Sequence, residues 1–162
     1  MEFGAANAGA ELDVRGALAY WGAPLTGCVP TSAVPLEETL VLALELSHQD
    51  ATVLRVLPTV LLKNRSRVNV PLLLTLARQK SVSAELGLVA DLAWNLRGVR
   101  VLSEDQMPQK PSGPPQPYAN LGGGPRMRAI VAERTPLVAR SWGFLMAASE
   151  DLFRATADRA GV

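Results

Sequence analysis

Cys28 and His48 are the two side chains of this chain best suited to covalent chemistry. A thiolate beside an imidazole can attack acyl groups, so the pair is a candidate for nucleophilic catalysis. No signature of a thiol enzyme surrounds either residue, and His48 falls at the predicted end of a helix, where the helix dipole favours an imidazole. One cysteine and one histidine cannot form a disulfide or complete a four-ligand zinc site. We therefore expect no catalytic residue, no metal and no cofactor here.

Paired carboxylates could support hydrolysis or bind a metal. The nearest set is Glu37, Glu38 and Glu45, in which Glu38 and Glu45 are seven residues apart and can share a helical face. Acids in the first turn of a helix have a simpler role, because they interact favourably with the helix dipole. The chain also lacks the Glu-x-x-His pairs of di-metal sites. A structural role is favoured for these acids.

The sequence LGGGPRMR, residues 121–128, is rich in glycine and contains two arginines. Phosphate-binding loops use glycine so that the backbone can approach an anion closely. This stretch lacks the Gly-Lys-Ser/Thr ending of a P-loop, and no strand is predicted before it. A flexible hinge is the better interpretation.

Residues 73–96 have the outline of a helix-turn-helix, with two helical segments joined by a short polar turn. A recognition helix should present cations or amides near its start, but residues 83–91 offer Glu85 and Asp91 and no cation. Ser81 also stands in the turn where glycine is common. The sequence therefore favours two packed core helices over a DNA-reading pair.

The stretch KNRSRVNVP, residues 63–71, lies in the most asymmetric charge distribution of the chain. No acid occurs between Asp50 and Glu85, whereas the cations are Arg55, Lys63, Arg65, Arg67, Arg78 and Lys80. Lys63, Arg78 and Lys80 fall near predicted helix C-termini, where cations are structurally favourable. Arg65 and Arg67 occupy the turn itself and have no such explanation.

Antiparallel helices on either side of this turn would place its cations about 15 Å from those near Lys80, because a ten-residue helix rises 1.5 Å per residue. The charges would then form two patches instead of one stripe. A solvated turn is the first interpretation, an acidic protein partner the second and nucleic acid the third.

Hydrophobic periodicity and capping residues predict a chain of helices. Asp50, Asn69, Ser83 and Thr135 are the expected caps, and Pro58 should kink or interrupt one helix near Leu57. The segment around Leu88 is apolar on nearly every face, which predicts the centre of the core. The helical segments are expected at 11–22, 35–49, 50–64, 69–80, 81–98 and 135–161.

Residues 103–125 hold six prolines and four glycines, which predicts an extended or disordered linker. Residues 126–134 can form a short helix or an ordered lead-in. The last segment is expected to be one amphipathic helix, which packs on the rest of the chain, on a second copy or on a partner. Its apolar face carries Trp142, Leu145, Leu152 and Phe153.

Composition limits the function classes. Sixteen basic and fifteen acidic residues give a net charge of +1, which argues against a dedicated nucleic-acid binder. No apolar run is long enough to span a membrane and no targeting segment is evident, so a soluble, cytoplasmic protein is expected. The use of Ala, Leu, Val and Arg is typical of a GC-rich bacterial genome. The hydrophobic share is 48% without glycine and roughly 55% with most of the 13 glycines, above the usual 45–50% on the comparable count, so the chain needs more buried surface than a small monomer usually provides.

The expected fold is all-α. Residues 1–10 are expected to be disordered, 11–102 to form a compact bundle of about five helices, 103–125 a linker, and 126–162 the C-terminal amphipathic helix. The leading hypothesis is a non-enzymatic bacterial protein–protein interaction module, an adaptor or subunit of a larger assembly, with a protein partner or a homo-oligomer. The alternatives are a nucleic-acid-associated regulator, antitoxin-like or a repressor component, using residues 63–80, and a small enzyme of unknown class. The candidate partner-binding residues are Arg65, Arg67, Arg78, Lys80, Trp142, Leu145, Leu152 and Phe153.

Overall fold

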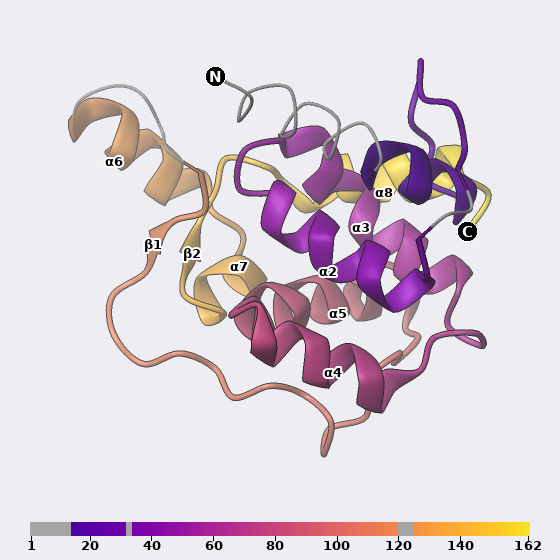
Figure 1. Ribbon diagram of the computed structural model, residues 1–162. Coiled ribbons are helices and arrows are strands. Elements are labelled where there is room, and N and C mark those ends of the chain that lie inside the picture. The colour runs from indigo at the N-terminus through magenta and orange to yellow at the C-terminus, as the bar shows by residue number, and fades with distance from the viewer. Residues whose placement is uncertain (1–13, 32–33, 120–124) are drawn as a thin grey trace, which may run out of the picture.

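The computed structural model describes residues 14–31, 34–119 and 125–162. The expected disordered N-terminus, residues 1–10, lies outside this range. The described chain is mostly helical, as the all-α prediction requires, with a short parallel strand pair in addition. After helical residues 14–20, the elements in Figure 1 are α2 (Leu36–Leu46), α3 (Ala51–Lys63), α4 (Val70–Gln79), α5 (Ser83–Arg97), β1 (Gln116–Pro117), α6 (Pro125–Arg134), α7 (Leu137–Ser141), β2 (Phe144–Leu145) and α8 (Glu150–Arg159).

Helix α5 is the central element of the core, as its apolar circumference predicts. Leu86, Val89 and Ala90 face a cluster built with α2, α3 and α4. Leu88 and Leu92 face a second cluster, to which the C-terminal segment contributes its aromatic side chains. The two apolar clusters therefore meet across one helix, and α5 is buried along most of its length.

Two of the four predicted helix caps are confirmed. The Asp50 carboxylate accepts hydrogen bonds from the backbone N–H groups of Thr52 and Val53 at the start of α3. The Asn69 side chain accepts one from the N–H of Leu72 at the start of α4. In both cases a short polar side chain satisfies backbone donors that the helix leaves free.

The other two predicted caps are wrong. Ser83 is the first residue of α5, and the residue before the helix is Val82, which has no capping side chain. Thr135 does not cap α7: its hydroxyl donates to the carbonyl of Val131, 2.7 Å away, and accepts from the N–H of Met146 at 3.0 Å. Thr135 therefore joins the end of α6 to the segment after β2.

The segment around Pro58 is helical, and of the two outcomes expected near Leu57, a kink or an interruption, the interruption does not occur. The helix runs from Ala51 to Lys63 with the proline inside it. Proline removes a backbone donor and costs about 3 kcal/mol in a helix interior. Here Val53, Val56 and the following apolar side chains of α3 are buried, so tertiary packing outweighs that local cost.

The single C-terminal helix predicted over residues 135–161 is also wrong. The segment forms α7, then β2, then α8. The break falls at Gly143, whose φ of +83° lies in the left-handed region that glycine adopts most easily. Trp142 ends α7 immediately before it. The glycine lets the chain leave the helix and enter a strand.

The proline-rich segment, expected to be an extended or disordered linker, is anchored at the far end of its described part. The N–H of Gln116 donates to the carbonyl of Gly143, and the N–H of Tyr118 donates to the carbonyl of Leu145, both at 2.9 Å. Pro117 lies between these two donors, at a position where its missing N–H costs no pairing. The segment passes beside α4 before it reaches β1 (Figure 1).

The C-terminal helix packs on its own chain. Helix α8 lies against α3 and α5, and Phe153 and Ala157 are completely buried there. Arg97 at the end of α5 pairs with Asp158 at 2.5 Å and donates to the backbone carbonyl of Val162 at 2.6 Å. None of the described helices is both long and apolar enough to cross a membrane.

Gly87 provides a sharp test of the packing between α5 and the C-terminal segment. A methyl group at this position would lie 2.3 Å from two ring carbons of Trp142, which is only 1% exposed. Glycine to alanine inside a helix normally stabilises by about 1 kcal/mol. We expect Gly87→Ala instead to destabilise the protein by about 1–3 kcal/mol, measured by urea unfolding.

The control for this prediction repeats the Gly87→Ala change in a variant whose ring at position 142 is smaller. In Trp142→Phe the outer indole carbons are absent, so Gly87→Ala should cost much less there than in the wild type. An equal cost in both backgrounds would show that the Trp142 ring is not the source of the effect.

Candidate functional site

The basic turn that follows α3 has a structural role. The Arg65 guanidinium donates to the carbonyl of Leu62 at 3.0 Å, and the Lys63 ammonium donates to the carbonyl of Gly22 at 3.1 Å. The sequence offered no structural explanation for Arg65, and this helix-end contact now supplies one. Lys63 holds the turn against the chain that follows residues 14–20.

Arg67 is exposed, as Lys63 and Arg65 are, and together with Lys63 it lines a hollow of about 540 Å³. Tyr20, Trp21 and Ser66 are among the other lining residues. Helix α4 separates this hollow from Arg78 and Lys80 by about 15 Å of helix. The cations thus lie at two ends of α4, in the two-patch arrangement that the sequence suggested.

Helix α4 leaves much of its apolar surface uncovered. It packs on α2 and α5, and buries only Leu73 and Ala77. Leu72 is 43% exposed, while Leu74 and Leu76 are half-buried on opposite sides of the helix. Leucines therefore line the open flanks of α4 as well as its core side.

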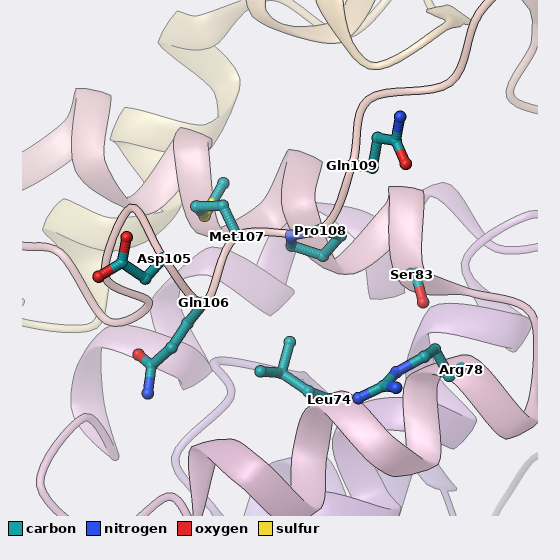
Figure 2. A pocket seen from close by; sticks show the side chains of 8 residues that line it. All are labelled: Leu74, Arg78, Ser83, Asp105, Gln106, Met107, Pro108 and Gln109. Carbon is teal, nitrogen blue, oxygen red and sulfur yellow. The ribbon is translucent and has the colours of Figure 1, made fainter.

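The first open flank of α4 is a hollow of about 480 Å³, which we call the Arg78 hollow. Figure 2 shows Leu74 and Arg78 rising from α4, with Met107 and Pro108 of the proline-rich segment across from them. The segment after α5 therefore forms one wall of the hollow. The complete lining is Leu74, Arg78, Ser83, Asp105, Gln106, Met107, Pro108 and Gln109.

The second open flank is a smaller hollow of about 290 Å³ between α2 and α4, which we call the Lys80 hollow. Its floor is apolar and its rim carries one charge of each sign, Glu38 and Lys80. The complete lining is Glu38, Val41, Leu42, Leu76 and Lys80. Arg78 and Lys80, both predicted partner-binding residues, thus stand beside separate apolar depressions of one helix.

Helices α4 and α5 have the shape of a helix-turn-helix without its accessible second helix. Ser81 in the turn has φ of +58°, the left-handed conformation for which glycine is common at this place. The residues at the start of α5 are covered, however, with Glu85 only 8% and Leu86 2% exposed. A helix buried from its first turn cannot enter a DNA groove as a recognition helix does.

Of the four C-terminal residues proposed as partner contacts, the two aromatic ones lie inside the chain. Trp142 is 1% exposed and donates from its indole N–H to Asp91 at 2.7 Å, and Phe153 is completely buried. Leu145 is half-buried in β2, whereas Leu152 is 43% exposed on α8. Of these four residues, Leu152 is the one with substantial surface for a partner.

His48 and Cys28 have different neighbours. The Nε2 atom of His48 lies 2.9 Å from the Glu85 carboxylate, and its Nδ1 atom contacts the carbonyl of Tyr118. Cys28 is half-buried near Arg15, which in turn pairs with Asp50. Because an acceptor occupies each ring nitrogen of His48, neither nitrogen is free to take a proton from a nucleophile in this arrangement.

The contacts of His48 form a clasp between α2, α5 and the strand pair. The imidazole stacks on Tyr118 with ring centroids 4.2 Å apart, and the Tyr118 hydroxyl hydrogen-bonds to Ser47 at 2.5 Å. The hydrogen bond to Glu85 is the main cause that raises the pKa of His48. Burial raises the pKa of Tyr118, so its hydroxyl stays protonated.

The carboxylates of α2 and the described part of the Gly-rich stretch do not add catalytic groups to the hollows beside α4. Glu37 accepts a hydrogen bond from the N–H of Asn69 at 2.7 Å and so links α2 to the start of α4. Within the Gly-rich stretch, residues 121–124 lie outside the described chain, and Arg126 and Arg128 are exposed on α6. In the part of the chain that is described, no group of three or more His, Cys, Asp or Glu side chains is placed to hold a metal.

No protein-family model matches this chain, and neither does any curated protein or solved structure.

Two features of the site were missing from the sequence interpretation. The first is the wall that Met107 and Pro108 form opposite α4, which depends on a contact between distant segments. The second is the exposure of α4, for which the sequence does carry a signal. Leu72, Leu73 and Leu74 are consecutive and point to different sides of a helix, so a single buried face cannot cover all three.

The His48 clasp predicts a pH-dependent stability. The folded-state pKa is raised above the ordinary value of 6.5, so the stabilisation is fully present below that value and is lost as the pH rises through the folded-state pKa. Glu85→Gln should therefore lower the free energy of unfolding at about pH 6 and flatten its fall at higher pH. Urea unfolding over a pH series measures this effect. Glu45→Gln, an exposed acid on α2, should keep the wild-type profile, and a Glu85→Gln profile parallel to the wild type would contradict the assignment.

Proposed function

We propose that this protein is a non-enzymatic protein–protein interaction module, an adaptor or subunit of a larger assembly, and that α4 is its docking face. The observation that carries the proposal is the poor coverage of α4, which buries only Leu73 and Ala77 among its leucines and neighbouring apolar residues. The docking face consists of Leu72, Leu74, Leu76, Arg78 and Lys80.

The free energy available at this face is of the size that binding sites use. Burying a leucine side chain fully is worth about 1.5–3 kcal/mol, and Leu72 keeps 43% of its surface exposed. A helix or extended segment laid along α4 would place apolar side chains in the hollows on both flanks. The partner would gain apolar contact from two sides of a single helix.

The charges at the rims would select the partner more than they would strengthen its binding. Arg78 faces the same hollow as Asp105, and Lys80 shares its hollow with Glu38. A partner must therefore present both signs of charge around its apolar anchors. This mixture fits a folded or helical protein segment better than a uniformly charged polymer.

A nucleic-acid-associated role is less well supported. Phosphate backbones require cations spaced along one continuous surface. Arg67 lies at one end of α4 and Lys80 at the other, while Arg65 is engaged with the end of α3. The acids Glu38 and Asp105 beside the other cations would repel phosphates.

The test compares three leucines changed to the same residue. Leu74→Asp alters the Arg78 hollow, Leu76→Asp alters the Lys80 hollow, and Leu137→Asp is a control on α7, where the leucine is 83% exposed. We expect at least one of the two α4 variants to weaken capture of a partner from the source cells about tenfold or more. Quantitative mass spectrometry of proteins retained by the tagged full-length chain measures this loss.

Cooperative thermal unfolding must first show that each variant is folded. Equal capture by the wild type and both α4 variants would refute the docking face. The same loss in Leu137→Asp would show a general effect of added charge and would refute it as well.

A further inference from the structure

Helix α6 has an apolar surface that the described part of its own chain leaves exposed. Among its residues only Val131 is buried, whereas Met127 is 45% and Ile130 43% exposed. Met127 and Ile130 are three positions apart and so lie side by side on the helix surface. Figure 1 shows α6 standing at the edge of the molecule, outside the group of helices around α5.

The attachment of α6 holds this surface outward. The Thr135 hydroxyl donates to the carbonyl of Val131, and the Arg140 guanidinium donates to the carbonyl of Ala132. Val131 and Leu145 line one shallow depression beside β1. These contacts fix the C-terminal half of α6 against the strand pair and leave Met127 and Ile130 free.

A helix of this length needs a covering surface. Isolated helices shorter than about 12–15 residues are marginal in water, and most helices in proteins depend on the packing of an apolar face. α6 has ten residues and one buried side chain. Among the described residues no further surface completes its packing, which leaves a surface of another molecule as the candidate.

The Lys80 hollow has an apolar floor, and the exposed acids near it, Glu38 and Glu45, outnumber its lysine, Lys80. Its floor of Val41, Leu42 and Leu76 is apolar. On α2, the exposed acids Glu38 and Glu45 lie on either side of Leu42 along the helix. Helix α6 brings apolar side chains together with three arginines, Arg126, Arg128 and Arg134, and a single acid, Glu133.

We propose that α6 of one copy of this chain docks in the Lys80 hollow of a second copy. Met127 and Ile130 enter the apolar floor between α2 and α4, and the arginines of α6 meet the acids of α2. The inference rests on the proposed function, because it takes one flank of α4 as a docking surface and names its partner as the chain itself.

The contact joins two different surfaces, so it can form either a closed dimer or an assembly that continues from copy to copy. Two copies can exchange their α6 helices reciprocally, which closes a dimer with two identical contacts. Otherwise each copy has one occupied and one open surface, and the contact continues into a ring or a chain. Either arrangement makes the oligomeric state depend on protein concentration.

The first experiment is sedimentation velocity of the full-length protein over a concentration series, with matched pairs of variants. Ile130→Asp should weaken self-association about tenfold or more, while Ala129→Asp, on the exposed far side of α6, should leave it unchanged. Leu76→Asp should weaken it similarly. Leu74→Asp, in the Arg78 hollow of the same helix, should not.

The second experiment mixes two defective variants. The Ile130→Asp chain keeps an intact Lys80 hollow, and the Leu76→Asp chain keeps an intact α6. An equal mixture should therefore recover association through one contact per pair, although each variant alone remains monomeric. Fluorescence anisotropy of one labelled chain titrated with the other measures the recovery, and a mixture as monomeric as its parts overturns the proposal.

A third experiment tests the same contact by exchanging charges, which does not disturb apolar packing. Glu38→Arg with Glu45→Arg in one chain, and Arg126→Glu with Arg134→Glu in another, change only exposed side chains. Each double variant should self-associate more weakly than the wild type, and their mixture should associate more strongly than either alone. Equal association of the mixture and its components overturns the pairing of α6 with α2.

The failure of this inference can be distinguished from failure of the proposed function. A wild-type chain that stays monomeric at all concentrations overturns self-docking. If Leu74→Asp or Leu76→Asp still reduces capture of a different protein in that case, α4 remains a docking face and its partner is not a second copy.

Discussion

The fold depends on a helix that is apolar around nearly its whole circumference. α5 cannot lie on the surface, because no face of it is polar enough to meet water along its length. Leu86 and Val89 require cover on one side, while Leu88 and Leu92 require it on the other. The helices before α5 provide the first cover, and the chain must return from its C-terminal region to provide the second.

The need to cover the second side of α5 explains why the proline-rich segment leads back to the core and why β1, α7, β2 and α8 follow it. Three contacts hold the second cover in place: the β1–β2 pair, the Trp142 ring against Gly87, and the stacking of His48 on Tyr118. The last two join a residue before or within α5 to a residue after it, and the first joins the end of the proline-rich segment to the chain after α7. The segment that looks like a linker in composition is therefore part of the core boundary, because its end carries the buried Tyr118.

The parts of this fold that sequence predicts are those that local interactions determine. Asp50 and Asn69 cap helices with donors two or three residues away, and the apolar circumference of α5 is visible without any partner. Ser83 and Thr135 also belong to the residue types that favour caps, but neither caps a helix, and Thr135 bonds instead to Val131 and, beyond α7 and β2, to Met146. The break at Gly143 required a strand partner more than twenty residues away, which no local pattern indicates. For the same reason the sequence identified Arg78 and Lys80 but not the hollows beside them.

The apolar excess of the chain divides between two uses. Much of it covers α5, and Trp142 and Phe153 belong to this part even though their helical spacing resembled a surface for a partner. Part of the remainder lies on α4 and α6, which bury few of their own apolar side chains. Because α5 is already packed on both sides, it offers the apolar side chains of α4 and α6 no further face on which to pack. An interaction surface on α4 is thus a consequence of how the core is filled: once both sides of α5 are covered, the remaining apolar side chains must meet water or another protein.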